Sequence, residues 1–211
     1  LISWGNGCAI DQKYSLYTSI GQYTDFIKYA VNQLETGTSV PYVPGVAYPD
    51  SKTLKLAVAT YSCPKPLDVL SDNIPSSIPA EQNWPWLINI HHECFGVLIG
   101  ASQVLTSKQC CPGRMKGKYV YSNTRRRMIF NHAIHEDLCL IQLNVEFPIL
   151  PKSYPICLNE GDVNPEMFIK SMENKEYQMA YTSAAECTAT YGLKLDDTHF
   201  CGTEVYSEQC Q

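Results

Sequence analysis

The alternation of apolar and polar positions predicts short β-strands through residues 74–211. Each apolar run is brief, and turn-forming residues separate it from the next. Many short strands with turn signals between them are typical of an antiparallel barrel or sandwich. The sequence therefore predicts a mostly β unit, with strands at 86–90, 96–99, 104–106, 118–121, 128–130, 138–143 and 178–181.

The N-terminal part of the chain has a different pattern. Residues 1–20 mix small, aromatic and β-branched residues, which predicts two short strands around a Gly/Cys turn. Residues 24–34 predict a helix with Thr24 as its N-cap and Asp25 in its first turn. Apolar residues recur at helical spacing on one face of this helix, at Phe26, Ile27, Ala30, Val31 and Leu34.

Residues 36–73 predict a connector between two units. Prolines interrupt this stretch repeatedly, at Pro41, Pro44, Pro49, Pro64 and Pro66. So long a segment with little capacity for regular structure indicates a boundary.

Composition indicates a folded, globular chain. Hydrophobic residues make up 45% and charged residues 18% of the 211 positions, which is typical of a folded protein with a hydrophobic core. The formal net charge of -5 gives no overall basic field, so we expect no nucleic-acid partner. A local basic cluster is interpreted as a solvated loop; it consists of Lys116, Lys118, Arg125, Arg126 and Arg127.

Ten cysteines are many for this length, and they indicate disulfides in a secreted or extracellular protein. No C-x-x-C pair is present, so a zinc ribbon is not expected. His91, His92 and Cys94, or His132, His135 and Glu136, lack a spacing diagnostic of zinc, and we predict no metal and no cofactor.

The chain opens on Leu1 rather than Met, which suggests that a leader was removed or that the sequence is an excerpt. No apolar run approaches the roughly 20 residues that a transmembrane helix needs. We therefore expect no transmembrane segment in this chain.

Two groups of motifs resemble the trypsin-like serine protease family. The first is Ser3-Trp4-Gly5-Asn6-Gly7-Cys8-Ala9, followed by Tyr17-Thr18 and Tyr23-x-Asp25-Phe26-Ile27, which is similar to the end of such a domain. The second is similar to its start and middle, and comprises Trp84-Pro85-Trp86, Cys94–Ile99, Val104–Cys110, Asp137–Leu143, Pro155–Leu158, Phe200-Cys201-Gly202 and Cys210-Gln211.

The resemblance implies a chymotrypsin-like antiparallel double β-barrel, here incomplete. The motifs occur in the wrong order for one domain, so they imply a fragment of a tandem, polyserase-like protein. Residues 1–35 would be the tail of a first domain, 36–73 a linker, and 74–211 a degenerate second domain that stops before the nucleophile motif. Residues 1–34 docking on 74–211, with Cys8 meeting Cys210, is a further hypothesis.

The family's chemistry needs a serine nucleophile, a histidine base and a buried aspartate. By resemblance Asp137 occupies the aspartate position, while Gln109 stands where the histidine should be; the G-D-S-G-G nucleophile motif is absent. A carboxamide cannot accept a proton near neutral pH, so we expect no catalysis. The alternative for Asp137 is a capped strand start or a surface carboxylate.

The resemblance also implies sites for a polypeptide. Ser3, Trp4 and Gly5 match the strand that pairs with substrate, and Ser15 stands where the family has a pocket-wall glycine. Glu208 matches the base of the specificity pocket; the alternative is an exposed loop acid.

Family positions imply disulfides Cys94–Cys110, Cys187–Cys201 and Cys63–Cys157. Cys111 and Cys139 are additional cysteines at positions that adjoin in the family's fold, where either a disulfide or two buried thiols is expected. Cys8 and Cys210 would pair within one complete domain.

Three functional hypotheses follow. The chain can belong to an endopeptidase whose activity lies in a preceding domain, or it can be a secreted pseudoprotease that binds, regulates or scaffolds. The third is an unrelated disulfide-rich extracellular binding module. The expected partner is a polypeptide substrate or another protein.

Overall fold

The computed structural model describes the chain in segments, at residues 2–5, 15–37, 85–91, 94–122, 125–148, 150, 153, 155–156, 158, 166–170, 176–192 and 194–204. These residues fall into two compact units. One combines residues 1–24 with 159–211, and the other spans residues 25–158. The predicted connector at 36–73 lies almost wholly outside the described residues, as do Cys8, Cys63, Cys157, Glu208 and Cys210.

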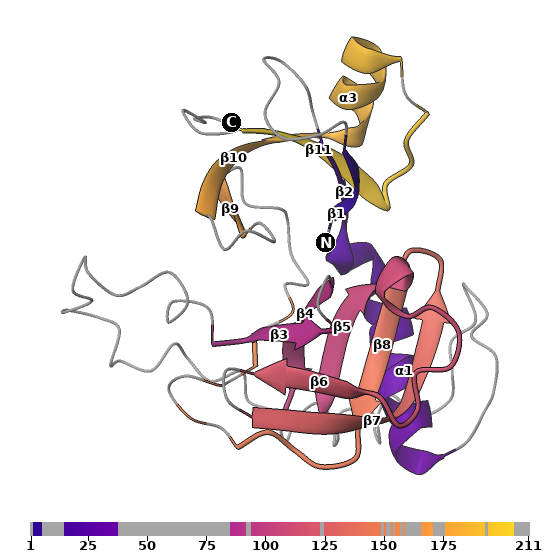
Figure 1. Ribbon diagram of the computed structural model, residues 1–211. Helices are drawn as coiled ribbons and strands as arrows, with labels where there is room; N and C mark the ends of the chain where they lie inside the picture. The colour runs from indigo at the N-terminus through magenta and orange to yellow at the C-terminus, as the bar shows by residue number, and fades with distance from the viewer. Residues whose placement is uncertain are drawn as a thin grey trace. The chain divides into compact units, whose positions relative to one another are not determined.

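The larger unit contains a closed six-stranded antiparallel barrel (Figure 1). Its strands follow the order β3-β4-β5-β8-β7-β6 around the barrel. Their bounds are β3 Leu87–Ile90, β4 Cys94–Gly100, β5 Gln103–Ser107, β6 Tyr119–Ser122, β7 Arg125–His135 and β8 Leu138–Leu143. The mostly β prediction is confirmed, since every one of these strands overlaps an expected run.

Alternation explains how the barrel forms its core. In β6, Val120 and Ser122 are buried while Tyr119 and Tyr121 are exposed, as expected for side chains on opposite faces of a strand. The interior is filled by apolar side chains that include Ile88, Ile90, Leu98, Val104, Met115, Val120, Ile129, Ile141 and Phe147.

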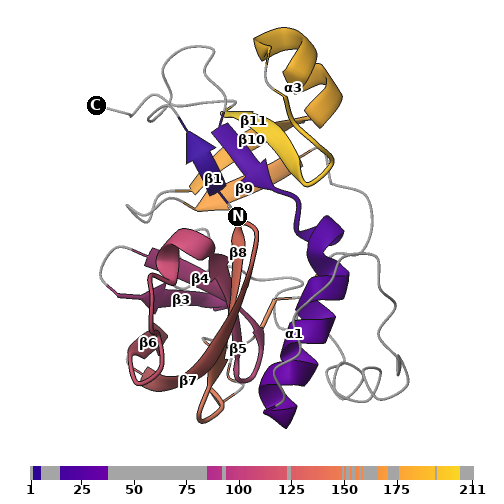
Figure 2. The same cartoon turned by 90° about the vertical axis from the view of Figure 1, so that its right-hand side faces the viewer.

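Strand β8 is buried along its whole length. Cys139, Ile141 and Leu143 belong to the barrel core, so the intervening residues point to the other face. On that face Gln142 accepts a hydrogen bond from Gln103 Nε2 at 3.1 Å, and Gln103 Nε2 also reaches Glu35 Oε1 at 3.0 Å. Glu35 belongs to helix α1 (Thr24–Thr36), so α1 lies against the outside of the barrel (Figure 2).

Helix α1 matches the predicted helix at 24–34, with one correction at its start. Thr24 is not an N-cap: its backbone is already helical, because the 3₁₀ helix η1 (Ile20–Tyr23) leads directly into α1. Its hydroxyl instead donates to the carbonyl of Gly21 at 2.8 Å. Phe26, Ile27, Ala30 and Leu34 are buried as the apolar periodicity predicted.

The smaller unit is a five-stranded antiparallel sheet with the order β1-β2-β11-β10-β9. Helix α3 (Ala184–Tyr191) follows β10, and Ser183 and Glu186 form a capping box at its start. The strand bounds are β1 Ile2–Gly5, β2 Ser15–Thr18, β9 Glu166–Lys170, β10 Glu176–Thr182 and β11 His199–Glu204.

This sheet joins the two ends of the described chain. Tyr17 of β2 is the ladder partner of Phe200 of β11, and Leu16 is the partner of Cys201. Residues 1–24 therefore complete a sheet formed by residues beyond 159, while α1 lies against the barrel. These units cut across the sequence-based boundaries at 35 and 74. The docking hypothesis for residues 1–34 agrees with this pairing, and the origin of that segment in a preceding domain stays a prediction.

Candidate functional site

The site predicted for catalysis lies at one end of the β5–β8 strand pair. Ser107, the last residue of β5, is the ladder partner of Leu138, the first residue of β8. The 3₁₀ helix η4 (Lys108–Cys110) continues from β5, and the amide of Lys108 donates to the carbonyl of Asp137 at 2.8 Å. Gln109 and Asp137 are thus held at the same end of the same strand pair.

Asp137 occupies a two-residue turn between β7 and β8. His135 pairs with Leu138, so only Glu136 and Asp137 form the connection, and Glu136 has a positive φ of 50°. Gln109 is exposed and Asp137 is half-buried. Asp137 is therefore less sheltered than the buried aspartate that the resemblance implied.

A disulfide fixes this corner of the barrel. Cys111, two residues after Gln109, is bonded to Cys139, two residues after Asp137. Both cysteines are buried, and the alternative of two free thiols is excluded. The adjoining Cys110 is bonded to Cys94 of β4, so consecutive residues tie η4 to two different strands.

The imidazole nearest to Asp137 along the chain is used in packing. The ring of His135 lies 5.0 Å from the ring of Phe26 on α1, and its Nε2 is 3.7 Å from Glu136 Oε1. The second β7 histidine, His132, has its pKa lowered by burial and, to a smaller extent, by the charge of Lys118. Sequence patterns gave no indication of the Phe26–His135 contact, because it joins segments far apart in the chain.

The predicted peptide-binding residues other than Glu208, which is outside the described residues, lie in the smaller unit. Gly5 of β1 and Gly202 of β11 are both ladder partners of Ser15 in β2, and Trp4 is the partner of Leu16. The sheet thus brings together the N-terminal residues Ser3, Trp4, Gly5 and Ser15 and a C-terminal strand. Cys201 of that strand is bonded to Cys187 of α3, as family position implied.

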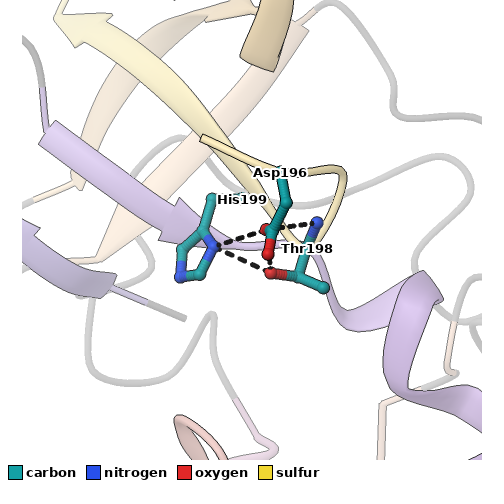
Figure 3. A network of polar contacts seen from close by, with 3 residues as sticks. All are labelled: Asp196, Thr198 and His199. Atoms are coloured by element: carbon teal, nitrogen blue, oxygen red, sulfur yellow. Dashed lines mark hydrogen bonds and ion pairs between the residues drawn. The ribbon is translucent and has the colours of Figure 1, made fainter. Parts of the chain in front are cut away.

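A polar network that sequence reasoning missed precedes β11 (Figure 3). Asp196 Oδ1 accepts hydrogen bonds from the amide of Thr198, at 3.1 Å, and from the Thr198 hydroxyl. His199 Nδ1 lies 3.2 Å from the same oxygen. The bonds from Thr198, followed by that of His199, lower the pKa of Asp196. The D-x-T spacing, which is typical of a local side-chain turn, was the available signal.

This network shapes a turn rather than a binding site. Asp196 is exposed, and the carbonyl of Thr198 accepts a hydrogen bond from the amide of Ser19 at 2.8 Å. Within the described segments, no group of three or more His, Cys, Asp or Glu residues could hold a metal ion. None of the described helices is long and apolar enough to cross a membrane.

Comparison with known proteins identifies the fold. No family model and no curated protein matches this sequence. Two solved structures of kallikrein-related peptidase 10 are similar to it. The first, in complex with Zn2+, is 17% identical, with a TM-score of 0.50 over 60% of this chain and 71% of that one. The second is 18% identical, with a TM-score of 0.51 over 61% and 71%. This likeness shows the chymotrypsin-like fold of trypsin-like serine proteases.

Proposed function

We propose that this chain is a secreted, non-catalytic member of the trypsin-like serine protease family that binds or regulates another polypeptide. The fold agrees with that family, and the sequence motifs fall in its order on each side of residues 36–73. The observation that carries the proposal is Gln109, held beside Asp137 at the position that the resemblance assigns to the general base.

Proton transfer is the step that Gln109 cannot perform. In the family's mechanism an imidazole removes the proton of the attacking hydroxyl and later returns it to the leaving amine. A carboxamide has no basic lone pair near neutral pH, so it can neither accept that proton nor deliver one. The carboxylate of Asp137 would then have no imidazole to orient.

Loss of the base is accompanied by a gain in rigidity at the same place. The Cys111–Cys139 disulfide joins the segments that carry Gln109 and Asp137. A covalent link of this kind stabilises a local geometry but gives no chemistry for amide hydrolysis. The disulfide therefore favours a structural or binding role for this corner of the barrel over a catalytic one.

Polypeptide recognition is the activity that the remaining site residues support. In the described part of the sheet β1 is an outer strand, paired with β2 alone. An extended segment can add to such an edge through main-chain hydrogen bonds, which depend little on side chains. Ser3, Trp4 and Gly5 would form this edge, Ser15 would line it, and Glu208 would favour a basic side chain.

The proposal is tested with peptide amides and a fluorophosphonate probe. The full 211-residue chain is incubated with fluorogenic Arg and Lys substrates, beside active trypsin as the control. We expect no turnover above buffer and no covalent label, for the chain itself and for Gln109→His, since the base alone does not supply a nucleophile. Labelling of the unsubstituted chain would overturn the proposal.

A second candidate function is proteolysis by a longer parent protein. The observation that favours it is the likeness of Ser3–Ala9 and Tyr23–Ile27 to the end of a protease domain. An upstream domain would then carry the activity. Assaying the parent with and without the region before Leu1 distinguishes this candidate, because activity would be lost with that region.

A further inference from the structure

Charge is strongly segregated along this acidic chain. Residues 94–135 contain seven of the 16 Lys and Arg residues and none of the 21 Asp and Glu residues. All four arginines of the chain lie there, at Arg114, Arg125, Arg126 and Arg127. The remaining residues therefore carry nine cations against 21 anions, so this one region is basic on a protein whose net charge is -5.

Part of this charge lies on two neighbouring barrel strands, β6 and β7, which are paired antiparallel (Figure 1). Tyr121 of β6 is the ladder partner of Arg126 in β7, and both side chains are exposed. We call this surface the β6–β7 basic face; its exposed members are Lys116, Tyr119, Tyr121, Arg126 and Phe130, and Arg125 is exposed at the adjoining start of β7.

Aromatic rings hold two of the cations on this face. The guanidinium of Arg126 lies 4.9 Å from the Tyr119 ring centroid, and Lys116 Nζ lies 5.0 Å from that of Phe130. These contacts fix the cations over a ring face while their N–H groups stay free to donate outward. Tyr119, Tyr121 and Phe130 are 38%, 42% and 44% exposed, so the face also offers apolar area.

No carboxylate neutralises this face within the described part of the chain. Arg125, Arg126 and Lys116 form no ion pair with a described residue, and the ion pairs found there involve His135 and His199. Arg127 differs, since its Nε donates to the backbone carbonyl of Glu146 at 2.8 Å and its guanidinium lies over Phe147. Arg127 thus anchors β7, whereas Arg125 and Arg126 are exposed.

We propose that the β6–β7 basic face binds a short acidic segment of a partner polypeptide that also carries aromatic or apolar side chains. Arginine forks pair with carboxylates in a bidentate manner, and the exposed rings suit apolar neighbours of those carboxylates. The face is only a few strand residues long, roughly 13–17 Å at about 3.3 Å per residue, which matches a short extended segment.

The acidic remainder of the protein favours this partner over a long polyanion. A long polyanion such as a nucleic acid or a sulfated polysaccharide is repelled by the net negative charge of the rest of the chain, which carries nine cations against 21 anions. Repulsion of this kind acts over about a Debye length, roughly 8 Å at physiological ionic strength. A short segment stays within the basic area. The inference does not depend on the loss of catalysis, because none of these residues belongs to the Gln109–Asp137 corner.

The test measures binding of labelled peptides to the full chain by fluorescence anisotropy at about 50 mM salt, where screening is weak. The probes are a Glu/Tyr peptide, the same peptide with Gln for Glu, a heparin oligosaccharide and an oligo-thymidine. The test variant is Arg125→Gln/Arg126→Gln, and the charge-matched control is Lys108→Gln/Lys194→Gln, since both lysines are exposed and lie outside the face.

We expect saturable binding of the Glu/Tyr peptide, about tenfold weaker for the arginine variant and unchanged for the control. Tyr121→Ala should weaken it as well, whereas the Gln/Tyr peptide should bind poorly. Failure of the chain to bind the Glu/Tyr peptide, or equal losses in the variant and the control, would overturn the proposal. Arginine-dependent binding that is tighter for heparin or oligo-thymidine than for the peptide would also overturn it.

Discussion

Tyr17 and Phe200 stack across the β2–β11 strand pair, with ring centroids 5.3 Å apart and an interplanar angle of 17°. One ring comes from the first strand pair of the chain and the other from its last described strand. Met179 and Tyr181 of β10 complete the same cluster. The association of the N-terminal strands with the C-terminal ones therefore has an apolar centre as well as a hydrogen-bonded ladder.

Removing the Tyr17 ring tests this association. We expect Tyr17→Ala to lower the free energy of unfolding by about 3–5 kcal/mol, since a buried aromatic side chain is deleted from a packed cluster. Amides of β11 should also exchange faster with solvent, because β2 is their ladder partner. Tyr121→Ala is the matched control, since Tyr121 is exposed on the barrel and its loss should cost no more than about 1 kcal/mol. Equal effects of the two changes would contradict the packing shown here.

The Cys111–Cys139 disulfide gives a second prediction, about stability. It closes a loop with a sequence separation of 28, so the double change Cys111→Ala/Cys139→Ala should destabilise the chain by about 3–4 kcal/mol. Urea unfolding of the purified protein measures this loss. Gln109→Ala is the control, because Gln109 is exposed beside the same corner and should leave the unfolding midpoint nearly unchanged. A double variant as stable as the parent would show that the link contributes no rigidity.

Residue periodicity was sufficient for the strands of the barrel and for α1, but it left a barrel and a sandwich open, and only the family resemblance implied a barrel. The alternation in β6 and the apolar face formed by Phe26, Ile27 and Leu34 are local sequence patterns, and the burial of these residues in the structure follows them. Helix α3 was not predicted, because Ala184–Tyr191 has no clear apolar face. Strands β9 and β11 were also absent from the predicted runs.

The candidate site depended on long-range register, which a single sequence does not contain. That Lys108 and Asp137 adjoin follows from the pairing of β5 with β8, and only the family resemblance suggested it. The ring contact between Phe26 and His135 and the pairing of Ser15 with Gly202 likewise join distant segments. No local pattern could have predicted either contact.

Glu35 gives a prediction about pH. Its pKa is raised, chiefly by burial and also by the charge of Glu146, while the hydrogen bond from Gln103 acts in the opposite direction. A carboxyl group with a raised folded-state pKa stabilises the fold below its unfolded value of 4.5, and this contribution is lost as pH rises through the folded value. Ionised Glu35 therefore costs stability at neutral pH.

We expect Glu35→Gln to be slightly more stable than the parent at pH 7, by less than about 1 kcal/mol, because the side chain is only partly buried and solvent screens its charge. The advantage should shrink as the pH falls through the folded-state pKa of Glu35, because the carboxylate then becomes protonated. Asp25→Asn is the matched control at the opposite end of α1, where a negative charge favours the helix dipole, so it should be destabilising at neutral pH. Thermal unfolding of the three proteins across pH measures both signs, and a less stable Glu35→Gln at pH 7 would refute the assignment.

The turn at Asp196 offers a test of how the N-terminal segment is held. The pKa of Asp196 is lowered by its bonds to Thr198 and His199, so its contribution is present above 3.8 and is lost as pH falls through the lower folded value. The carbonyl oxygen of Thr198 accepts a hydrogen bond from the amide of Ser19, so hydrogen exchange of that amide reports whether the turn is intact.

Protection of the Ser19 amide from hydrogen exchange should therefore fall when Asp196 is replaced by Ala. In the unsubstituted protein it should fall at acidic pH, as the carboxylate takes up a proton and the turn loses its acceptor. Asp197→Ala is the adjacent control, since Asp197 is also exposed and has no part in the network that holds Thr198. Exchange of the Ser19 amide that is equally fast in both variants would mean that β2 is held by its ladder with β11 alone.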